Sequence, residues 1–394
     1  MKQAVAFGRF GLLLIAALTL AACSGTPATT WAGLAANDHL AYAASSQFIY
    51  AVNLTGDNFG KEAWRFPKSA DNNIGTFSAS PAVSSTVVIA AADGPANSYS
   101  GTVFGLDPET GNEQWCLALD TKAAQRLNCP QAPSATATGP LGITISTDNR
   151  VMDHIVIAGD RAYFGLNSGM VYAVDVISGT VRWSFQAQQA VWAAPLVDPA
   201  DGTVYVGSLD HNLYALSLAS GAVEWKRDLG AAIAGQPAQQ GSTLYVGTFG
   251  DEVVALNAKD GTSQWSVRAT NWVWGTPVLN DNVLYFTDVG GSVYAVDAGN
   301  GAKKWVATPG DALRAAPLVT TDTVVVGDRT GKLFALDRNT GHSIWPQPAT
   351  IKGQLLGAPV LVSDTILLAP YAGDNLLVGY TLSGAEKLAY APGK

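Results

Sequence analysis

The sequence has few charged residues, cysteines and histidines. Of its 394 residues only 14% are Asp, Glu, Lys or Arg, and it contains three cysteines and four histidines. Its formal net charge is −8 and it has no basic run, which argues against nucleic acid or an anionic lipid surface as the main partner. With 48% hydrophobic residues, 41 glycines and 11 tryptophans, the composition is typical of a large β-rich protein with many tight turns.

A recognisable catalytic motif is also missing. No histidine stands near Ser and Asp in a catalytic pattern, and there is no Gly-x-Ser-x-Gly elbow and no glycine-rich phosphate loop. The four histidines are far in sequence from the cysteines, so no metal-ligand spacing occurs. The sequence therefore predicts no catalytic residues, no cofactor and no metal site.

Long hydrophobic segments are absent too. The apolar run at residues 10–20 has 11 residues, which is too short to cross a bilayer as a stable helix. It follows Lys2 and Arg9, as in a secretory signal peptide. Leu20-Ala21-Ala22-Cys23 then resembles a bacterial lipobox.

The lipobox resemblance implies a signal peptide over residues 1–22, a lipid on Cys23 and a lipidated tether over residues 23–30. Ser24 after the cysteine resembles an outer-membrane sorting signal. We therefore expect a lipid-anchored protein in the cell envelope, at the periplasmic face of an outer membrane or on the extracytoplasmic surface. The alternative is an ordinary secretory signal peptide with a chance cysteine.

The two remaining cysteines, Cys116 and Cys129, are 13 residues apart in a chain expected to be exported. This setting predicts a disulfide that closes a short loop, with a stabilisation of about 3 kcal/mol on the chain-entropy model.

One unit recurs along the chain: an apolar run, an Asp, a turn glycine and a tryptophan four residues after that glycine. The last four intervals between these tryptophans are 42, 40, 40 and 40 residues. An eighth copy keeps its glycine, Gly384, but has Leu388 where the tryptophan is expected. The seven tryptophans of this pattern are Trp64, Trp115, Trp183, Trp225, Trp265, Trp305 and Trp345.

Each unit reads as four short strands separated by turn residues. In the sixth unit we expect strands over residues 274–279, 282–286, 292–296 and 303–307. Repetition of four strands about every 40 residues is the signature of a β-propeller. We predict an all-β fold, a single monomeric eight-bladed propeller of four-stranded antiparallel blades over residues 31–391. The chain at about residues 116–146 is longer than the repeat of about 40 residues requires. This extra length predicts an insertion at the rim, which is either functional or passive.

The pattern Ala-x-Asp-x-x-x-Gly-x-x-x-Trp resembles the tryptophan-docking motif of the pyrroloquinoline-quinone (PQQ) type propeller superfamily. It is complete at Ala173 to Trp183, Ala295 to Trp305 and Ala335 to Trp345. The resemblance implies that the seven tryptophans lie on outer strands and pack against the adjacent blade. Their role is then structural.

Two branches of this superfamily are compatible with the repeats. The quinoprotein dehydrogenases hold PQQ against a disulfide between adjacent cysteines, and no Cys-Cys pair exists in this sequence. The BamB-like lipoproteins are non-enzymatic eight-bladed propellers that bind BamA in outer-membrane β-barrel assembly. This second resemblance implies a protein–protein interaction scaffold with a BamA-like envelope partner. A propeller that binds a small ligand or carbohydrate is a third alternative.

A partner surface is expected on the face where outer strands lead into the next blade. The loops on that face supply seven candidate partner-binding residues: Trp192, Trp272, Trp274, Leu313, Arg314, Leu355 and Leu356. Trp and Arg are often dominant at interfaces. The alternative for Trp192 and Trp274 is a purely structural role, in which they pack between inner strands. Five aspartates of the same face form either a carboxylate ring or ordinary turns: Asp210, Asp251, Asp288, Asp328 and Asp374.

Overall fold

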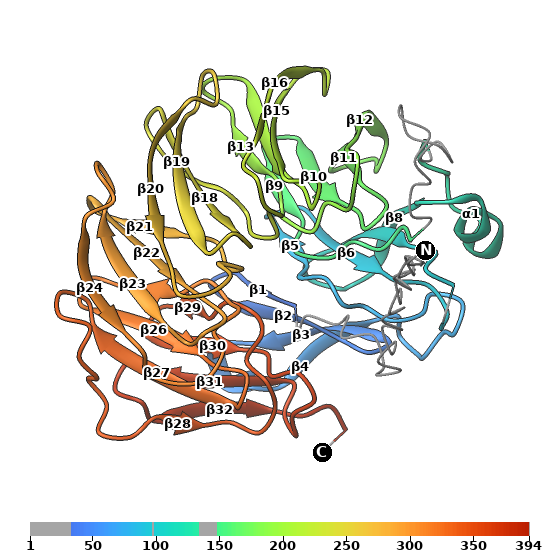
Figure 1. The fold of residues 1–394 in the computed structure, drawn as a ribbon. Coiled ribbons are helices and arrows are strands. Elements are labelled where there is room, and N and C mark those ends of the chain that lie inside the picture. The colour runs from blue at the N-terminus through green and yellow to red at the C-terminus, as the bar shows by residue number, and fades with distance from the viewer. Residues whose placement is uncertain (1–32, 97, 134–147, 394) are drawn as a thin grey trace, which may run out of the picture.

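The computed structural model describes residues 33–96, 98–133 and 148–393. These residues form eight four-stranded antiparallel sheets arranged in a ring (Figure 1). Each sheet, or blade, consists of four strands that are consecutive in sequence. The predicted all-β, eight-bladed propeller is confirmed. The predicted signal peptide, Cys23, the tether and residues 134–146 of the predicted rim insertion lie outside the described residues.

The strands of blades 1 to 4 are β1 Leu34–Ala36, β2 Leu40–Ser45, β3 Phe48–Asn53, β4 Glu62–Phe66; β5 Ala82–Val83, β6 Val88–Ala92, β7 Thr102–Leu106, β8 Glu113–Ala118; β9 Val156–Ala158, β10 Arg161–Gly165, β11 Met170–Asp175, β12 Val181–Gln186; β13 Leu196–Asp198, β14 Thr203–Gly207, β15 Asn212–Ser217 and β16 Val223–Asp228. Those of blades 5 to 8 are β17 Ala238–Gln240, β18 Thr243–Thr248, β19 Glu252–Asn257, β20 Ser263–Arg268; β21 Val278–Asn280, β22 Val283–Thr287, β23 Val293–Asp297, β24 Lys303–Ala307; β25 Leu318–Val319, β26 Thr323–Gly327, β27 Lys332–Asp337, β28 Ala349–Thr350; β29 Val360–Val362, β30 Thr365–Leu368, β31 Leu377–Thr381 and β32 Glu386–Tyr390. A 3-10 helix, η1 (Gly56–Asn58), lies in the last turn of blade 1, and helix α1 (Thr121–Leu127) follows blade 2.

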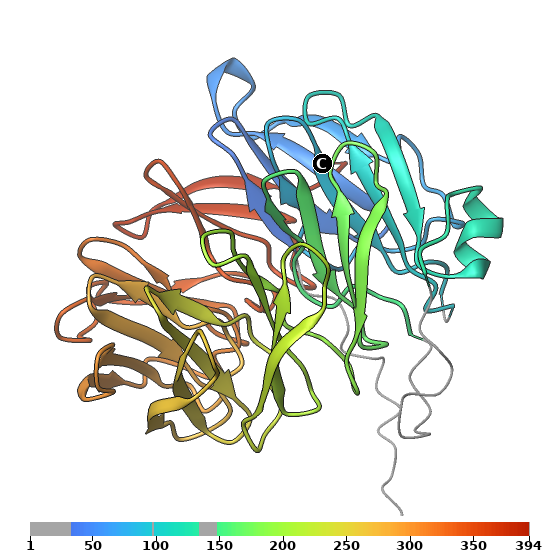
Figure 2. The same cartoon turned by 90° about the horizontal axis from the view of Figure 1, so that it is seen from above.

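The first strand of each blade lies nearest the axis of the ring. These inner strands contact their counterparts in the next blade, as β1 does with β5 and β29, and β21 with β17 and β25. The middle strands are almost fully buried, and the fourth strands form the rim. Figure 2, seen from above, shows the first and last blades side by side.

The strand predictions for blade 6 hold within one residue for its last three strands, β22 to β24. The first strand differs, because β21 begins at Val278 and not at Trp274. Trp274 instead lies in the loop before Pro277, a residue that has no N–H to donate to a sheet.

Each docking tryptophan lies flat against the turn glycine of the following blade. A Cβ added to Gly111 would lie 2.4 Å from Cε3 of Trp64, and one on Gly341 would lie 2.6 Å from Cε3 of Trp305. The indole N–H of Trp64 donates to the carbonyl of Pro108 in the next blade at 2.9 Å. The same bond to the following blade occurs for Trp115, Trp183, Trp225, Trp305 and Trp345. Among the described residues, Trp265 alone of the seven has a buried N–H without a hydrogen-bond partner.

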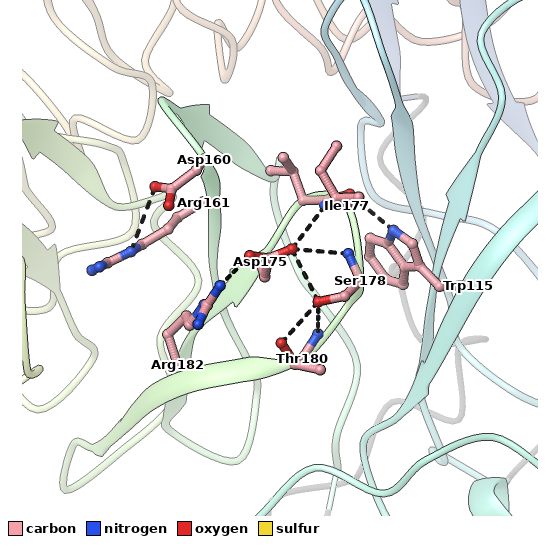
Figure 3. Close-up of polar contacts among 9 residues, drawn as sticks. Trp115, Asp160, Arg161, Asp175, Ile177, Ser178, Thr180 and Arg182 are labelled. Atoms are coloured by element: carbon pink, nitrogen blue, oxygen red, sulfur yellow. Dashed lines mark hydrogen bonds and ion pairs between the residues drawn. The ribbon is translucent and has the colours of Figure 1, made fainter.

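The motif aspartate shapes the turn that receives the indole, as Figure 3 shows for blade 3. The carboxylate of Asp175 accepts hydrogen bonds from the backbone N–H groups of Ile177 and Ser178 at 3.0 and 2.9 Å. Arg182 also donates to it. These contacts, the Arg182 bond first, lower the pKa of Asp175 to about 2. The fixed turn presents the Val176 carbonyl to the Trp115 N–H at 2.9 Å.

Blade 7 departs from the predicted pattern at its rim. Trp345 precedes the outer strand β28, which has two residues only. Two prolines, Pro346 and Pro348, follow Trp345, and neither can donate a ladder hydrogen bond. The indole nonetheless packs on Gly384 and donates to the Leu382 carbonyl at 3.0 Å.

The ring closes without a tryptophan. Leu388 pairs with Gly379, which is the register position that the docking tryptophan occupies in other blades. Its side chain contacts Gly60 of blade 1, because a Cβ added to Gly60 would lie 2.9 Å from Cδ1 of Leu388. The Tyr390 hydroxyl donates to the Glu62 carboxylate at 2.7 Å. Blades 8 and 1 are therefore joined by side-chain packing and not by a shared sheet.

A disulfide between Cys116 and Cys129 is present, as predicted. Cys116 lies inside β8, so the insertion starts after Ala118 and not at Cys116. Helix α1 follows, capped by Asp120, whose carboxylate accepts the Ala123 N–H. No helix within the described residues is long and apolar enough to cross a bilayer.

We predict that Gly341→Ala lowers the free energy of unfolding by roughly 2–4 kcal/mol. The new Cβ would collide with Trp305, and φ of +72° disfavours a side chain. Urea denaturation followed by tryptophan fluorescence measures the loss. Gly241→Ala is the matched control, since φ is +56° there but nothing lies within 4 Å, and its cost should be near 1 kcal/mol. Equal losses in the two variants would contradict the docking account.

We also predict that Leu388→Ala weakens the closure between blades 8 and 1. Removing a buried leucine typically costs about 2–5 kcal/mol, and Leu388 is 5% exposed. Leu382→Ala, at an exposed position of the same blade, should cost far less. The readout is the urea midpoint together with limited proteolysis of the terminal blades.

Candidate functional site

The loops that lead into the inner strands converge on the axis at one end of the ring, here called the axial face. They surround a cavity of about 280 Å³, here called the axial cavity. Residues from all eight blades line it. Its larger and charged lining residues are Leu34, Asp153, His154, Trp192, Trp274, Arg314 and Leu356.

The order of residues in these loops explains which side chains face the cavity. Val191 and Val273 are fully buried, and each packs where a glycine of the preceding blade's second strand leaves room. A Cβ on Gly165 would lie 2.2 Å from Cγ1 of Val191. The next residue in each loop, Trp192 or Trp274, is only partly buried and lines the cavity.

The same alternation corrects two of the candidate partner residues. Leu313 and Leu355 hold the buried position and are 1% and 2% exposed, in the cores between neighbouring blades. They therefore do not reach a partner surface. Arg314 and Leu356 hold the cavity-facing position, although Leu356 is itself 8% exposed.

Four aromatic rings form an unbroken series of ring contacts on the axial face, here called the aromatic ladder. Trp272 lies over Phe249 with ring centroids 4.8 Å apart and planes at 13°. Phe249 contacts Trp274 at 4.9 Å, and Trp274 stacks with Trp192 at 5.9 Å and 20°. The Arg314 guanidinium carbon lies 3.8 Å from the Trp274 ring centroid, a cation–π geometry.

Trp192 and Trp274 belong to blades 4 and 6 and meet across blade 5. They can do so because blade 5 has Ala234 and Gly235 at the corresponding place. The Trp192 N–H donates to Asn167 at 2.6 Å, which fixes this ring. The alternative of a simple wedge between inner strands is not what the geometry shows, since the buried valines fill that space.

Trp272 is the exposed end of the ladder, with 46% of its surface accessible. Phe249 was not a predicted site residue. The signal that could have found it is the repeat itself, because Phe249 is aromatic where the matching turns of blades 4 and 6 have Leu209 and Val289.

Three of the five aspartates serve turns and not a carboxylate ring. Asp288 and Asp328 are 0% and 1% exposed. Asp288 accepts the backbone N–H groups of Gly290 and Ser292 and the Tyr294 hydroxyl. Asp210 accepts the Gln188 N–H and the Tyr214 hydroxyl. Of the other two, Asp251 has a left-handed backbone (φ +60°), and Asp374 forms an ion pair with Lys352 at 2.7 Å.

The cavity also holds an ionisable pair that the sequence did not reveal. Nδ1 of His154 lies 3.0 Å from Oδ1 of Asp153. Burial opposes protonation of His154, but the Asp153 carboxylate and a bond with Gln236 outweigh it, and the pKa of His154 is raised. No group of three or more His, Cys, Asp or Glu within the described ranges is placed to hold a metal ion.

Comparison with known proteins identifies the family. The profile of the family described as "Outer membrane protein assembly factor BamB" matches residues 145–232 and 209–382, more than half of the chain. The chain belongs to the BamB family. The matched region contains the aromatic ladder and Arg314, and excludes blades 1 and 2 with the disulfide.

One curated relative with the same name as the family matches part of the chain. The outer membrane protein assembly factor BamB of Yersinia pestis is 26% identical over 206 residues, which are 50% of this chain and 43% of that protein. The alignment thus spans less than half of the relative's length.

Three solved structures share the fold at low identity. BamB from Moraxella catarrhalis superposes with a TM-score of 0.66 at 18% identity, covering 88% of this chain and 94% of that one. The computationally designed Ika8 protein gives 0.66 at 14% identity, covering 92% and 96%. Quinohemoprotein alcohol dehydrogenase from Comamonas testosteroni gives 0.68 at 12%, covering 92% and 76%. These likenesses establish the propeller fold and nothing finer.

Outside the BamB-family match, blade 2 buries a carboxylate on the turn between β6 and β7. Asp93 is 8% exposed and accepts a hydrogen bond from the Ser78 hydroxyl at 2.8 Å. Burial raises the pKa of Asp93 to about 7, although Ser78 and the Arg150 charge act in the opposite direction. The folded state therefore favours the protonated acid.

We predict that Asp93 makes the fold less stable as pH rises from about 4 to about 7. The unfolded chain releases this proton near pH 4, whereas the folded chain holds it to about pH 7, so folding is favoured at the lower pH. Asp93→Asn should remove roughly 1–3 kcal/mol of this dependence in urea titrations between pH 5 and 8. Asp260→Asn, at an exposed turn whose carboxyl pKa is lowered by Thr262, should leave the slope unchanged. An unaltered slope in Asp93→Asn would contradict the prediction.

Proposed function

We propose that this protein is a non-enzymatic interaction scaffold of the cell envelope, anchored by a lipid on Cys23, that binds an envelope protein through its axial face. The observation that carries the proposal is the aromatic ladder. The exposed ring of Trp272 stacks on Phe249, and Phe249 contacts Trp274. The Arg314 guanidinium lies over the Trp274 ring. Membership of the BamB family supports a BamA-like partner in outer-membrane protein assembly.

The physical basis is pre-organisation. Tryptophan and arginine dominate the binding energy of many interfaces, and ordering a mobile side chain costs free energy on binding. Stacking on Phe249 restricts the Trp272 ring before any partner arrives. The blade cores beneath supply a rigid base, because Val273 on the same loop is fully buried.

The position of the first strand supports a partner close to the membrane. Leu34 and Ala35 line the axial cavity, so the chain enters blade 1 at the axial face. About ten residues separate Cys23 from that point, and an extended segment of this length spans at most roughly 35 Å. A lipid on Cys23 would thus keep the axial face within reach of a membrane-embedded protein.

The dehydrogenase alternative fits the residues poorly. Quinoprotein dehydrogenases hold PQQ against a disulfide of adjacent cysteines, whereas this sequence has no such pair. The disulfide of this chain joins Cys116 in the outer strand β8 to Cys129 and does not line the axial cavity. We therefore propose no redox activity.

We expect Trp272→Ala to weaken binding to the purified periplasmic portion of a BamA-like protein from the same organism by roughly 30-fold. Loss of an interface tryptophan commonly costs about 2 kcal/mol or more. Biolayer interferometry with the mature protein measures the affinity. The matched control is Ile177→Ala, since Ile177 is 65% exposed but lies in the turn that receives Trp115, outside the axial face.

Two results would contradict the proposal. One is an unchanged affinity of Trp272→Ala, and the other is an equal loss in Ile177→Ala. Dye-linked oxidation of an alcohol or sugar by the purified protein would overturn the non-enzymatic assignment.

A further inference from the structure

Among the Phe, Tyr and Trp side chains of the described residues, two are exposed, and both lie on the axial face. Trp272 is 46% exposed and Tyr99 is 38% exposed. Tyr99 lies in the loop between β6 and β7 of blade 2, and its carbonyl accepts the N–H of Asn149 in the segment that leads into β9. The other large apolar side chains with comparable exposure are aliphatic: Ile177, Val223, Val306, Ile344 and Leu382.

The backbone at Tyr99 has a conformation that tyrosine rarely adopts. Its φ of +51° lies in the left-handed region, where a bulky side chain is strained and glycine is favoured. The next residue, Ser100, is fully buried, and its hydroxyl donates to Asp120 at 2.6 Å. Residues held in strained conformations are concentrated at functional sites. The fold itself therefore does not call for a tyrosine at this position.

The Tyr99 ring is oriented by an arginine. The guanidinium carbon of Arg150 lies over the ring, 4.7 Å from its centroid. Arg150 does not depend on this ring for charge compensation, because its Nε and Nη2 donate to the carboxylate of Asp148 at 2.8 and 2.6 Å. The contact restricts the Tyr99 ring before any partner arrives, as stacking on Phe249 does for Trp272.

Tyr99 is connected to the aromatic ladder by an unbroken series of side-chain contacts. The Trp192 N–H donates to Asn167 at 2.6 Å, and the Asn167 amide donates to Asp148 at 2.8 Å. Asp148 in turn pairs with Arg150, which contacts Tyr99. The exposed end of the ladder and Tyr99 therefore belong to one packed network, and this network fixes their relative position.

The two exposed rings lie on opposite sides of the axial opening. Tyr99 belongs to blade 2, whereas Trp272 lies in the loop that leads into blade 6, four blades further round a ring of eight (Figure 1). A partner surface that contacts both rings has to cross the opening. Stable interfaces cover about 800 Å² on each partner, which is the surface that a folded domain offers.

From these observations we infer that one folded domain of the envelope partner lies across the axial opening and contacts Tyr99 as well as Trp272. The inference rests on the proposed function and adds a second anchor to it. Tyrosine, like tryptophan, is enriched among the residues that dominate interfaces. Tyr99 lies outside the residues that the family profile matches, so this anchor is a feature of this chain's own blade 2.

Biolayer interferometry with the mature protein and the purified periplasmic portion of the BamA-like protein tests the second anchor. We expect Tyr99→Ala to weaken binding roughly 10-fold, as for loss of a dominant interface side chain. Tyr99→Phe keeps the ring and should bind within about threefold of the unaltered protein. Val306→Ala is the matched control, since Val306 is 47% exposed but lies on the outer strand β24, and its affinity should be unchanged.

A glycine variant separates binding from stability. Tyr99→Gly should unfold at a higher urea concentration than Tyr99→Ala, because only glycine adopts the positive φ without strain. It should nevertheless bind as weakly as Tyr99→Ala, because both variants lack the ring. Recovery of full affinity in Tyr99→Gly would show a structural role and would overturn the inference.

The double variant Tyr99→Ala with Trp272→Ala shows whether one partner contacts both rings. Distant contacts contribute independently, so the two losses of affinity should multiply. If Trp272→Ala loses affinity while Tyr99→Ala does not, the inference fails and the proposed function stands. If Trp272→Ala keeps its affinity, both fail. An equal loss in Val306→Ala, or full affinity of a short isolated peptide of the partner, would also overturn the inference.

Discussion

The packing of an indole on a glycine of the next blade is the contact on which the ring depends. Trp64 on Gly111 and Trp305 on Gly341 show the requirement, since an added Cβ would lie within 2.6 Å of either ring. The glycine also has a positive φ, which any other residue would adopt with strain. The motif aspartate holds the turn, and the turn carbonyl receives the indole N–H. One short motif thus joins two blades by shape, hydrogen bonding and burial together.

The blades are held together by the docking tryptophans at the rim and by the buried residues of the loops. The cavity-facing residues of the same loops lie outside these inter-blade contacts. Val191, Val273 and Leu313 pack between blades, and their successors face the axis. The ring therefore presents Trp192, Trp274 and Arg314 at its axis. The structures that resemble this one at 12 to 18% identity are an assembly factor, a designed protein and a dehydrogenase, so the fold by itself does not indicate one function.

The seam between blades 8 and 1 shows how far the repeat can vary. Leu388 replaces the indole on Gly60, and Tyr390 adds a hydrogen bond to Glu62. A leucine covers less of the glycine surface and donates nothing, so the tyrosine hydroxyl supplies the polar contact. At the rim of blade 7, Pro346 and Pro348 shorten the outer strand, yet Trp345 still donates its hydrogen bond to the next blade. The packing of a tryptophan on the next blade therefore does not require a full set of strand hydrogen bonds around the tryptophan.

The sequence alone determined the blade count, the strand order and the disulfide, because each follows from residues that recur at fixed spacing or from two cysteines in a chain expected to be exported. It also pointed to the loops of the axial face. It could not tell Leu313 from Arg314, since neighbours in a loop point to opposite sides only once the backbone path is known. It did not reveal Phe249 beneath Trp272, or Trp192 meeting Trp274 across Ala234, because those contacts join residues 23 to 82 positions apart in different blades. Spacing along one chain encodes the repeated unit, whereas the curvature of the closed ring decides which side chains meet at its axis.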